Sequence, residues 1–347
     1  MANSEAEKKD YDEGYSTAFP PREFDTSQLE GIHPDVQFGI VGDKLSELFS
    51  PLANNPPGTG LPLLNCGGFN MPAFMVSYYP WIRNFPIDEK DIIVASHPKS
   101  GTHWLYYNVY LIATGNFDTD LKENKIQLLE IPKPPTPSQY LKMSKMEPPR
   151  FFSTHLPATM LPRNANTCHI IYIYRNSKDV AVSLFNHVKS MSIARTEDSD
   201  PQVTFKYFCN SFINDMSPFG PYHKHLLSYD KLQKDWEGKN ILLIRYEDLN
   251  RDQRGTIKKI AEFLGKELDE KMIDRIIEAT SVEAMRKNDE FNWHPMREAG
   301  LWSKKVEFIR KGVIGDWKNE LFDDELVKLF NDYVEKNLPE HLRAPDE

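Results

Sequence analysis

The segment from Ala95 to Trp104, ASHPKSGTHW, combines residue types that bind an anion. It follows DIIVA, a short apolar run typical of a buried parallel strand, and the residues after it are predicted to form a helix. Ligands of open α/β sheets bind at the carboxyl ends of the strands, and the backbone N–H groups at a helix amino terminus attract negative charge. Lys99 adds a cation to this loop. The segment therefore predicts a phosphate-type site.

Four apolar segments are predicted to be the strands that position this loop. They are IIVAS from Ile92, RFFST from Arg150, HIIYIY from His169 and NILLIRY from Asn240. A helical pattern starts at Thr102, and a second one covers residues 255–265 and stops at Gly265, a residue suited to a helix carboxyl terminus. Strands that alternate with helices predict an α/β fold: one domain with a central, mostly parallel sheet and helices on both faces.

Composition narrows the class of protein. The chain has 42 basic and 51 acidic residues, a net charge of −9, so we expect no nucleic acid partner. Three scattered cysteines (Cys66, Cys168 and Cys209) predict neither a disulfide framework nor a zinc site, and no metal is expected. There is no signal peptide pattern, Ala2 excludes myristoylation, and no run of eighteen apolar residues occurs. These features predict a cytoplasmic protein with no membrane partner.

Several segments are predicted to lie outside regular structure. The first 70 residues are rich in Pro, Gly and Asn and are expected to form a loosely structured lead. Three long connections follow, at 130–149, 187–201 and 286–308. Connections of this length in a compact domain usually act as lids or binding loops. They are therefore expected to shape a binding site.

The loop does not match the Walker A spacing, because Lys99 precedes Gly101. It does resemble the phosphosulfate-binding loop of the cytosolic sulfotransferases, Tyr-Pro-Lys-Ser-Gly-Thr-Thr-Trp. Further segments resemble the same family, in the family's order: RFFSTHLP, YRNSKDVAVS, RYEDL, TSVEAM and RKGVIGDWKN. The resemblance covers Ile92 to about Asn319. It implies a sulfotransferase domain over 71–347 with a P-loop-like phosphosulfate-binding loop.

The resemblance implies an activity and a site. The enzyme would move a sulfonate from 3′-phosphoadenosine 5′-phosphosulfate (PAPS) to a hydroxyl or amine of a small apolar acceptor, leaving 3′-phosphoadenosine 5′-phosphate (PAP). His155 and Lys99 are the implied catalytic residues. Trp104 and Tyr246 would sandwich the adenine, and Arg175, Ser183 and Arg310 would bind the 3′-phosphate. The implied donor-binding residues are Lys99, Ser100, Gly101, Thr102, His103, Trp104, Arg175, Ser183, Tyr246, Thr280, Ser281, Met285, Arg310, Lys311 and Gly312.

The residue chemistry agrees with these roles. Two guanidinium groups, Arg175 and Arg310, can each bind phosphate oxygens bidentately. Sulfonate transfer needs a base for the acceptor hydroxyl, and His155, with an ordinary pKa near neutrality, suits that role. Lys99 can stabilise the charge that develops on the leaving oxygen. The alternatives are structural: His155 as a strand-end residue, Arg175 as a partner of Asp179, and Lys311 as a solvated charge.

This chain also departs from the family pattern. Ser153 stands where the family usually has Lys, two residues before the histidine, so one cation is missing. His103 replaces a Thr, and Val282 replaces a common aromatic residue. The family's dimer motif keeps only Lys318, so the oligomeric state stays open.

The acceptor is not readable from the sequence. The segment SYYPW at 77–81, together with Phe151, Phe152 and Phe185, is expected to line an apolar acceptor pocket. Three alternatives to sulfonation remain. One is elimination through a transient sulfonate, as in the insect retinol dehydratases that the chain also resembles; the others are a P-loop nucleotide kinase and an idle donor-binding protein.

Overall fold

Five strands form one sheet in which every neighbouring pair is parallel. The computed structural model describes residues 63–66, 68–72, 75, 79–117, 127–130, 137–190, 201–288, 291, 308–320 and 322–346. The strand order is β4 (Gln127–Leu128), β5 (Phe151–Thr154), β3 (Ile92–Ser96), β6 (His169–Tyr174) and β7 (Ile241–Arg245). The four predicted strands are confirmed to within one residue, whereas two-residue β4 was too short for a sequence pattern to indicate.

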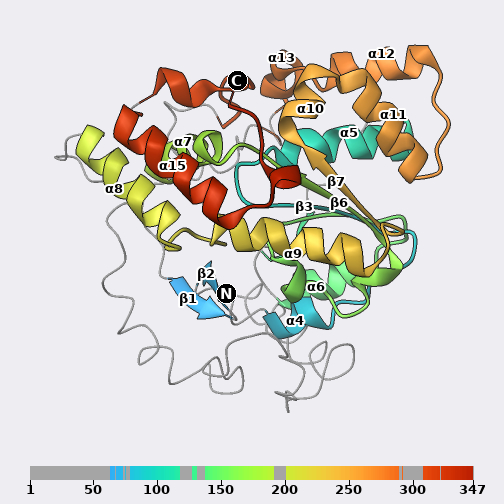
Figure 1. The fold of residues 1–347 in the computed structure, drawn as a ribbon. Helices are drawn as coiled ribbons and strands as arrows, with labels where there is room; N and C mark the ends of the chain where they lie inside the picture. The colour runs from blue at the N-terminus through green and yellow to red at the C-terminus, as the bar shows by residue number, and fades with distance from the viewer. Residues whose placement is uncertain are drawn as a thin grey trace, which may run out of the picture.

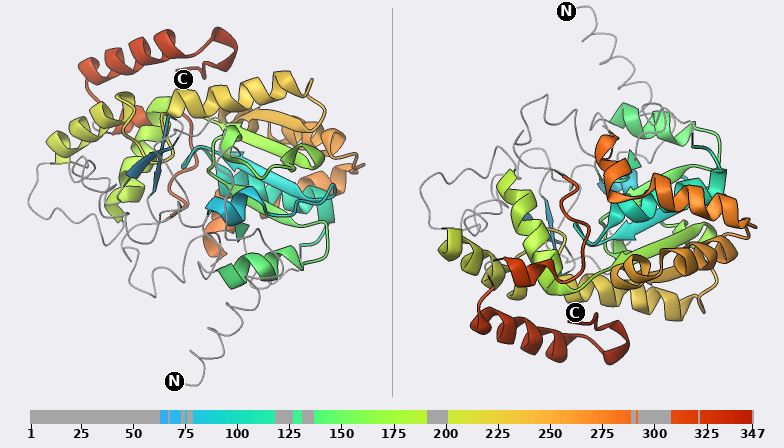
Figure 2. Two further views of the ribbon diagram at one scale, coloured as in Figure 1. Left: turned by 90° about the horizontal axis from the view of Figure 1, so that it is seen from below. Right: turned by 90° about the horizontal axis from the view of Figure 1, so that it is seen from above.

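Helices cover both faces of this sheet, as predicted (Figures 1 and 2). Alternate residues of each strand enter different cores, since side chains of a strand alternate between its faces. Ile92, Val94, Ile171 and Ile173 pack in one core with α5 (Thr102–Thr114), α10 (Tyr246–Arg251), α11 (Gln253–Phe263), α12 (Glu270–Ala279) and α13 (Val282–Lys287). Ile93, Ala95, Ile170 and Tyr172 pack in the other with α4 (Tyr79–Arg83), α6 (Pro137–Ser144), α7 (Ser177–Ser190), α8 (Pro201–Ile213), α9 (Tyr222–Asp235) and α15 (Asp324–Asn337).

A small antiparallel hairpin packs on the second core. It consists of β1 (Leu63–Cys66) and β2 (Phe69–Pro72), and Cys66 and Met71 are fully buried. The hairpin is tied to the loop before α9, because Phe219 N–H donates to Asn70 O and Asn70 N–H donates to Gly220 O, both at 2.7 Å. The expected boundary at residue 70 lies within β2, and residues 1–62 of the expected lead lie outside the described residues.

The predicted helices begin and end within two residues of the positions that their sequences indicate. α5 ends at Gly115, whose φ of 65° is left-handed and whose N–H donates to Leu111 O at 2.8 Å. α11 starts two residues before the prediction because the Asp252 carboxylate accepts the N–H of Gly255 at 2.8 Å. Short 3₁₀ turns lie at Ala158–Met160, Ala165–Thr167, Asp316–Asn319 and Glu340–Leu342. Among the described helices, none is long and apolar enough to cross a bilayer.

The three long connections are partly helical. The first contains α6, α7 extends to Ser190 into the second, and α13 reaches Lys287 in the third. The remaining parts, 191–200 and most of 289–307, lie outside the described residues, and the expected lid role stays a prediction.

Candidate active site

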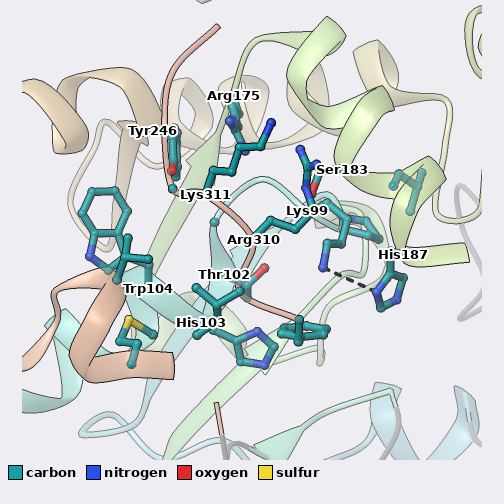
Figure 3. A pocket seen from close by; sticks show the side chains of 18 of the residues that line it. Lys99, Thr102, His103, Trp104, Arg175, Ser183, His187, Tyr246, Arg310 and Lys311 are labelled. Carbon is teal, nitrogen blue, oxygen red and sulfur yellow. Dashed lines mark hydrogen bonds between the residues drawn. The ribbon is translucent and has the colours of Figure 1, made fainter. Parts of the chain in front are cut away.

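A cavity of about 410 Å³ lies at the carboxyl ends of the strands. It is formed by the loop between β3 and α5, the end of β5, one face of α7, the start of α10, the junction of α12 and α13, and residues 308–316. Figure 3 shows the side chains that point into it. The structure brings together fifteen predicted residues: Lys99, Gly101, Thr102, His103, Trp104, His155, Arg175, Ser183, Tyr246, Thr280, Ser281, Met285, Arg310, Lys311 and Gly312.

Ser100 is the predicted residue that does not line the cavity. Its side chain is fully buried, and no hydrogen-bond partner of its hydroxyl lies among the described residues. Its neighbours shape the loop: Lys99 has a φ of 70° and Gly101 a φ of 111°. A Cβ on Gly101 would lie 2.8 Å from Cδ2 of Tyr246, so glycine permits both the left-handed backbone and this close approach. The first turn of α5 thereby presents its N–H groups toward the cavity, since a helix's first N–H groups lack intrahelical partners.

Lys99 places its amino group inside this cavity. Its Nζ lies 3.4 Å from Nδ1 of His187 and 3.9 Å from the centre of the Phe308 ring. Burial lowers the pKa of Lys99, the charges of Arg310 and Arg175 act in the same direction, and together they bring it to about 7. An anion beside Lys99 would relieve this repulsion.

His155 is held with one ring nitrogen available as a base. Nδ1 lies 2.9 Å from Ser96 O, and a carbonyl oxygen only accepts, so Nδ1 carries the proton and Nε2 has the lone pair. Burial lowers the pKa of His155 to about 4; the Ser96 hydrogen bond opposes this shift and the Lys99 charge adds to it. The expectation of an ordinary pKa near neutrality is therefore wrong. The ring is neutral at pH 7, as a base must be.

Two residues that the sequence analysis missed fix the backbone of His155. The Glu130 carboxylate accepts the His155 N–H at 2.5 Å and the Thr154 hydroxyl at 2.7 Å. On the other side, His225 Nε2 donates to His155 O at 3.0 Å, and the Tyr172 hydroxyl donates to His225 Nδ1 at 2.9 Å. Burial raises the pKa of Glu130 to about 7. Neither residue lies in a motif, so only the fold could identify them.

Arg175 also lines the cavity and lies over the ring of Tyr246, with its Cζ 4.2 Å from the ring centroid. Its Nη2 donates to Val313 O at 2.8 Å and to Asp179 at 3.1 Å. Arg175 therefore has both roles: it pairs with Asp179, as the structural alternative expected, and it lines the cavity. Its Nε is buried, and no partner of this atom lies in the part of the chain that the structure describes. A buried guanidinium N–H without a partner suits an anionic ligand.

Arg310 and Lys311 are paired with carboxylates. Arg310 pairs with Asp316 and, at 3.0 Å, with Glu320, and Lys311 donates to Asp316 at 2.6 Å. Asp316 is the single carboxylate among the described lining residues, against four cationic side chains. Gly312 has a φ of 70°, and a Cβ there would lie 2.5 Å from Val282. The balance of charge fits an anion with two phosphate-bearing ends.

The aromatic residues do not form the expected sandwich. The rings of Trp104 and Tyr246 contact each other edge to face, with centroids 5.4 Å apart and planes at 63°. They leave no slot for a base between them. Both residues line the cavity, and the Tyr246 ring also supports Arg175.

Three further predicted donor residues have structural roles as well. The Thr280 hydroxyl donates to Ile276 O and accepts from Gln253 Nε2 at 2.6 Å. Ser281 caps α13 by accepting Ala284 N–H at 3.2 Å, and Met285 is buried in the core.

The acceptor side of the cavity is apolar, although not through the expected aromatic residues. Trp81, Phe152 and Phe185 lie in the core instead, because their strand and helix faces point away from the cavity. Phe151 packs on the other core, and residues 77–78 lie outside the described residues. The apolar lining comes from Pro72, Leu128, Leu184, Val188, Pro218 and Phe219.

Comparisons with known proteins match this architecture. The family model described as "Sulfotransferase domain" matches residues 89–341. Sulfotransferase 1E1 of Homo sapiens is 33% identical over 282 residues, 79% of this chain and 92% of the relative. Sulfotransferase 1C2 of Oryctolagus cuniculus is 32% identical over 273 residues, 76% of this chain and 88% of the relative.

A solved structure of retinol dehydratase with androsterone and the inactive cofactor PAP is also similar. Its TM-score is 0.74 at 27% identity, and the match covers 88% of this chain and 97% of that chain. Mouse sulfotransferase SULT7A1 with PAP has a TM-score of 0.60 at 28% identity, covering 76% and 89%. The described residues fit PAPS, because four cationic side chains, an unpaired buried guanidinium N–H and the Trp104 indole line one cavity. The chain therefore belongs to the sulfotransferase family and is a PAPS-dependent sulfotransferase.

Proposed function

We propose that His155 is the general base that takes the proton of the acceptor hydroxyl. The observation that carries this proposal is the hydrogen bond from Nδ1 to Ser96 O, which leaves Nε2 to accept. As the acceptor oxygen forms its bond to sulfur, the bond from sulfur to the phosphate oxygen breaks, and that oxygen keeps the electron pair. Lys99 stabilises the charge on it. The acceptor proton ends on Nε2 of His155.

The donor is held at both of its charged ends. The first turn of α5 and Lys99 bind the 5′-phosphosulfate, because N–H groups and an ammonium meet there. Arg175, Ser183 and Arg310 bind the 3′-phosphate, with Lys311 and Gly312 beside them. Adenine lies on the face of Trp104. Before the phosphate binds, the Asp316 carboxylate holds the side chains of Arg310 and Lys311 in place. When the phosphate binds, these two cations move partly from Asp316 to the phosphate.

The acceptor is a small, apolar molecule with an uncharged hydroxyl. Six apolar residues line this side of the cavity, and Asp316, the one carboxylate among the described lining residues, is engaged at the donor side. A protonated amine would lose its hydration there without gaining a counter-charge. This favours phenols, alcohols and steroids over amines. A cytosolic location and a sulfotransferase domain over 71–347, with the β1–β2 hairpin packed on its core, complete the proposal.

Dehydration of an alcohol through its sulfonate is a second candidate. It is supported by the match to retinol dehydratase in complex with retinol and PAP, with a TM-score of 0.73 and 97% of that chain covered. In that reaction sulfate leaves with its C–O bond electrons, a neighbouring C–H proton goes to a base, and a double bond forms. The family assignment favours both sulfonyl reactions over the nucleotide kinase alternative.

The test is a panel of phenols, aliphatic alcohols, steroids, an allylic alcohol and amines with labelled PAPS, followed by mass analysis of the products. We expect sulfated hydroxyl compounds and no sulfated amines. A dehydrated allylic product with free sulfate would establish the second candidate. PAPS that binds without any turnover would identify an idle binding protein and contradict both.

A further inference from the structure

Ser153, at the position where the family resemblance implies a lysine, supplies no hydrogen-bond donor to the cavity. Its side chain is fully buried, its hydroxyl points to Gln127 O at 3.5 Å, and it does not line the cavity. A sulfonyl group has three oxygens, which gain charge during transfer and need donors. The cavity must draw such donors from elements other than β5.

His187 lies where such a hydrogen-bond donor is needed. It is on α7, one turn after Ser183, so both side chains lie on the same face of the helix and both line the cavity (Figure 3). Its Nδ1 lies 3.4 Å from Nζ of Lys99, and its ring packs edge to face against Phe308 with centroids 5.7 Å apart. An oxygen bound by Lys99 therefore lies beside the His187 ring.

The contact with Lys99 determines which nitrogen of His187 carries the proton. A protonated lysine only donates, so Nδ1 accepts and Nε2 bears the hydrogen. Burial and the neighbouring charge of Lys99 hold the pKa of His187 well below its usual value. Among the described residues, the titratable groups His103 and His155 also face it, and a proton on either would lower this pKa in the same direction. His187 is thus a neutral hydrogen-bond donor beside the ammonium.

We propose that His187 is a further catalytic residue, which donates a hydrogen bond from its ring N–H to the sulfonyl oxygens and supplies the donor missing at Ser153. The imidazole keeps its proton throughout, since the acceptor proton goes to His155 and the leaving electron pair stays on the phosphate oxygen. This inference rests on the proposed function, which puts the sulfonyl end of PAPS at Lys99.

The test compares the binding of PAPS with that of PAP, because the two differ only in the sulfonate. Both are titrated by calorimetry without acceptor. In His187→Phe, PAPS affinity should fall about tenfold or more, the usual worth of a hydrogen bond to a charged group, while PAP affinity stays within about twofold. His187→Gln keeps an N–H donor and should recover most of the loss. Lys189→Gln, an exposed change two residues away on α7, should alter neither affinity.

PAP affinity also reports that each variant is folded, and His187→Leu repeats the comparison with a smaller side chain. If PAPS affinity is unchanged in His187→Phe or His187→Leu while Lys99→Met lowers it, the inference about His187 is wrong and the proposed function stands. If Lys99→Met lowers the affinities for PAPS and PAP equally, the sulfonyl end does not lie at Lys99. That result overturns the donor placement and the inference with it.

Discussion

The Asp179 carboxylate accepts the backbone N–H of Gly315 at 3.0 Å, which joins α7 to the segment that carries Arg310. The same carboxylate accepts the N–H of Trp317 at 3.0 Å and pairs with Arg175 at 3.1 Å. Asp179 is buried, so its charge is balanced almost wholly by these three partners. Two cations that are far apart in the sequence are thereby brought to one end of the cavity.

We expect Asp179→Asn to weaken this junction. An amide loses the charge that pairs with Arg175 and turns an N–H group toward one of the backbone donors. The free energy of unfolding should fall by about 1–3 kcal/mol, and PAP affinity should fall by about tenfold. Denaturant unfolding and calorimetric titration measure the two effects. Asp332→Asn, in an exposed pair with Lys328 at 3.0 Å, should change stability by less than about 0.5 kcal/mol and is the control.

Binding of the donor should depend on pH through Lys99. Its pKa of about 7 means that the ammonium is lost as pH rises through neutrality in the free enzyme, and a neutral amine attracts the 5′-phosphosulfate less. PAPS affinity should therefore be highest below pH 7 and decline above it, with uptake of a proton on binding near pH 7. Titration calorimetry in buffers of different ionisation enthalpy measures that uptake. In Lys99→Met the uptake should disappear; its persistence there would assign the proton to another group.

Gly101→Ala should damage the loop between β3 and α5. The new Cβ meets the Tyr246 ring at 2.8 Å, and alanine is strained at a φ of 111°. We expect a loss of about 1–3 kcal/mol in stability together with weaker PAP binding. The matched control is Gly265→Ala, where φ is +63° and nothing lies within 4 Å, so stability should fall somewhat while PAP affinity is retained. Equal PAP affinities in the two variants would contradict a role of the loop in donor binding.

Strands and motifs could be predicted because their signals are local. IIVAS and HIIYIY are apolar or aromatic at every position except Ser96 and His169, since both faces of the sheet are covered, and this burial is visible in the residues themselves. The cavity-lining residues came from contiguous motifs that resemble a known family. The loop between β3 and α5 and the segment 310–312 each carry several of them.

What the sequence could not predict depends on long-range contacts. Glu130 follows β4, a strand of only two residues, and contacts His155 25 positions away, while the contact of His187 with Lys99 joins positions 88 apart. The lowered pKa of His155 results from burial by several elements at once. The aromatic residues expected in the acceptor pocket, such as Phe152, have ordinary apolar patterns, and only the register of β5 shows that they face the core.

Turnover of His155→Ala on an aliphatic alcohol, at pH 7 and saturating PAPS, tests the central claim most directly. If Nε2 takes the acceptor proton, kcat should fall on the order of 10²–10⁴-fold, while PAPS affinity stays within about threefold because the donor is held by other residues. On the acid side, the parent kcat/KM should decline only toward pH 4, where His155 gains a proton, and titration of His155 should not affect it around neutrality. A variant that keeps most of its turnover on the alcohol would contradict the account and leave His155 as a residue that only ends β5.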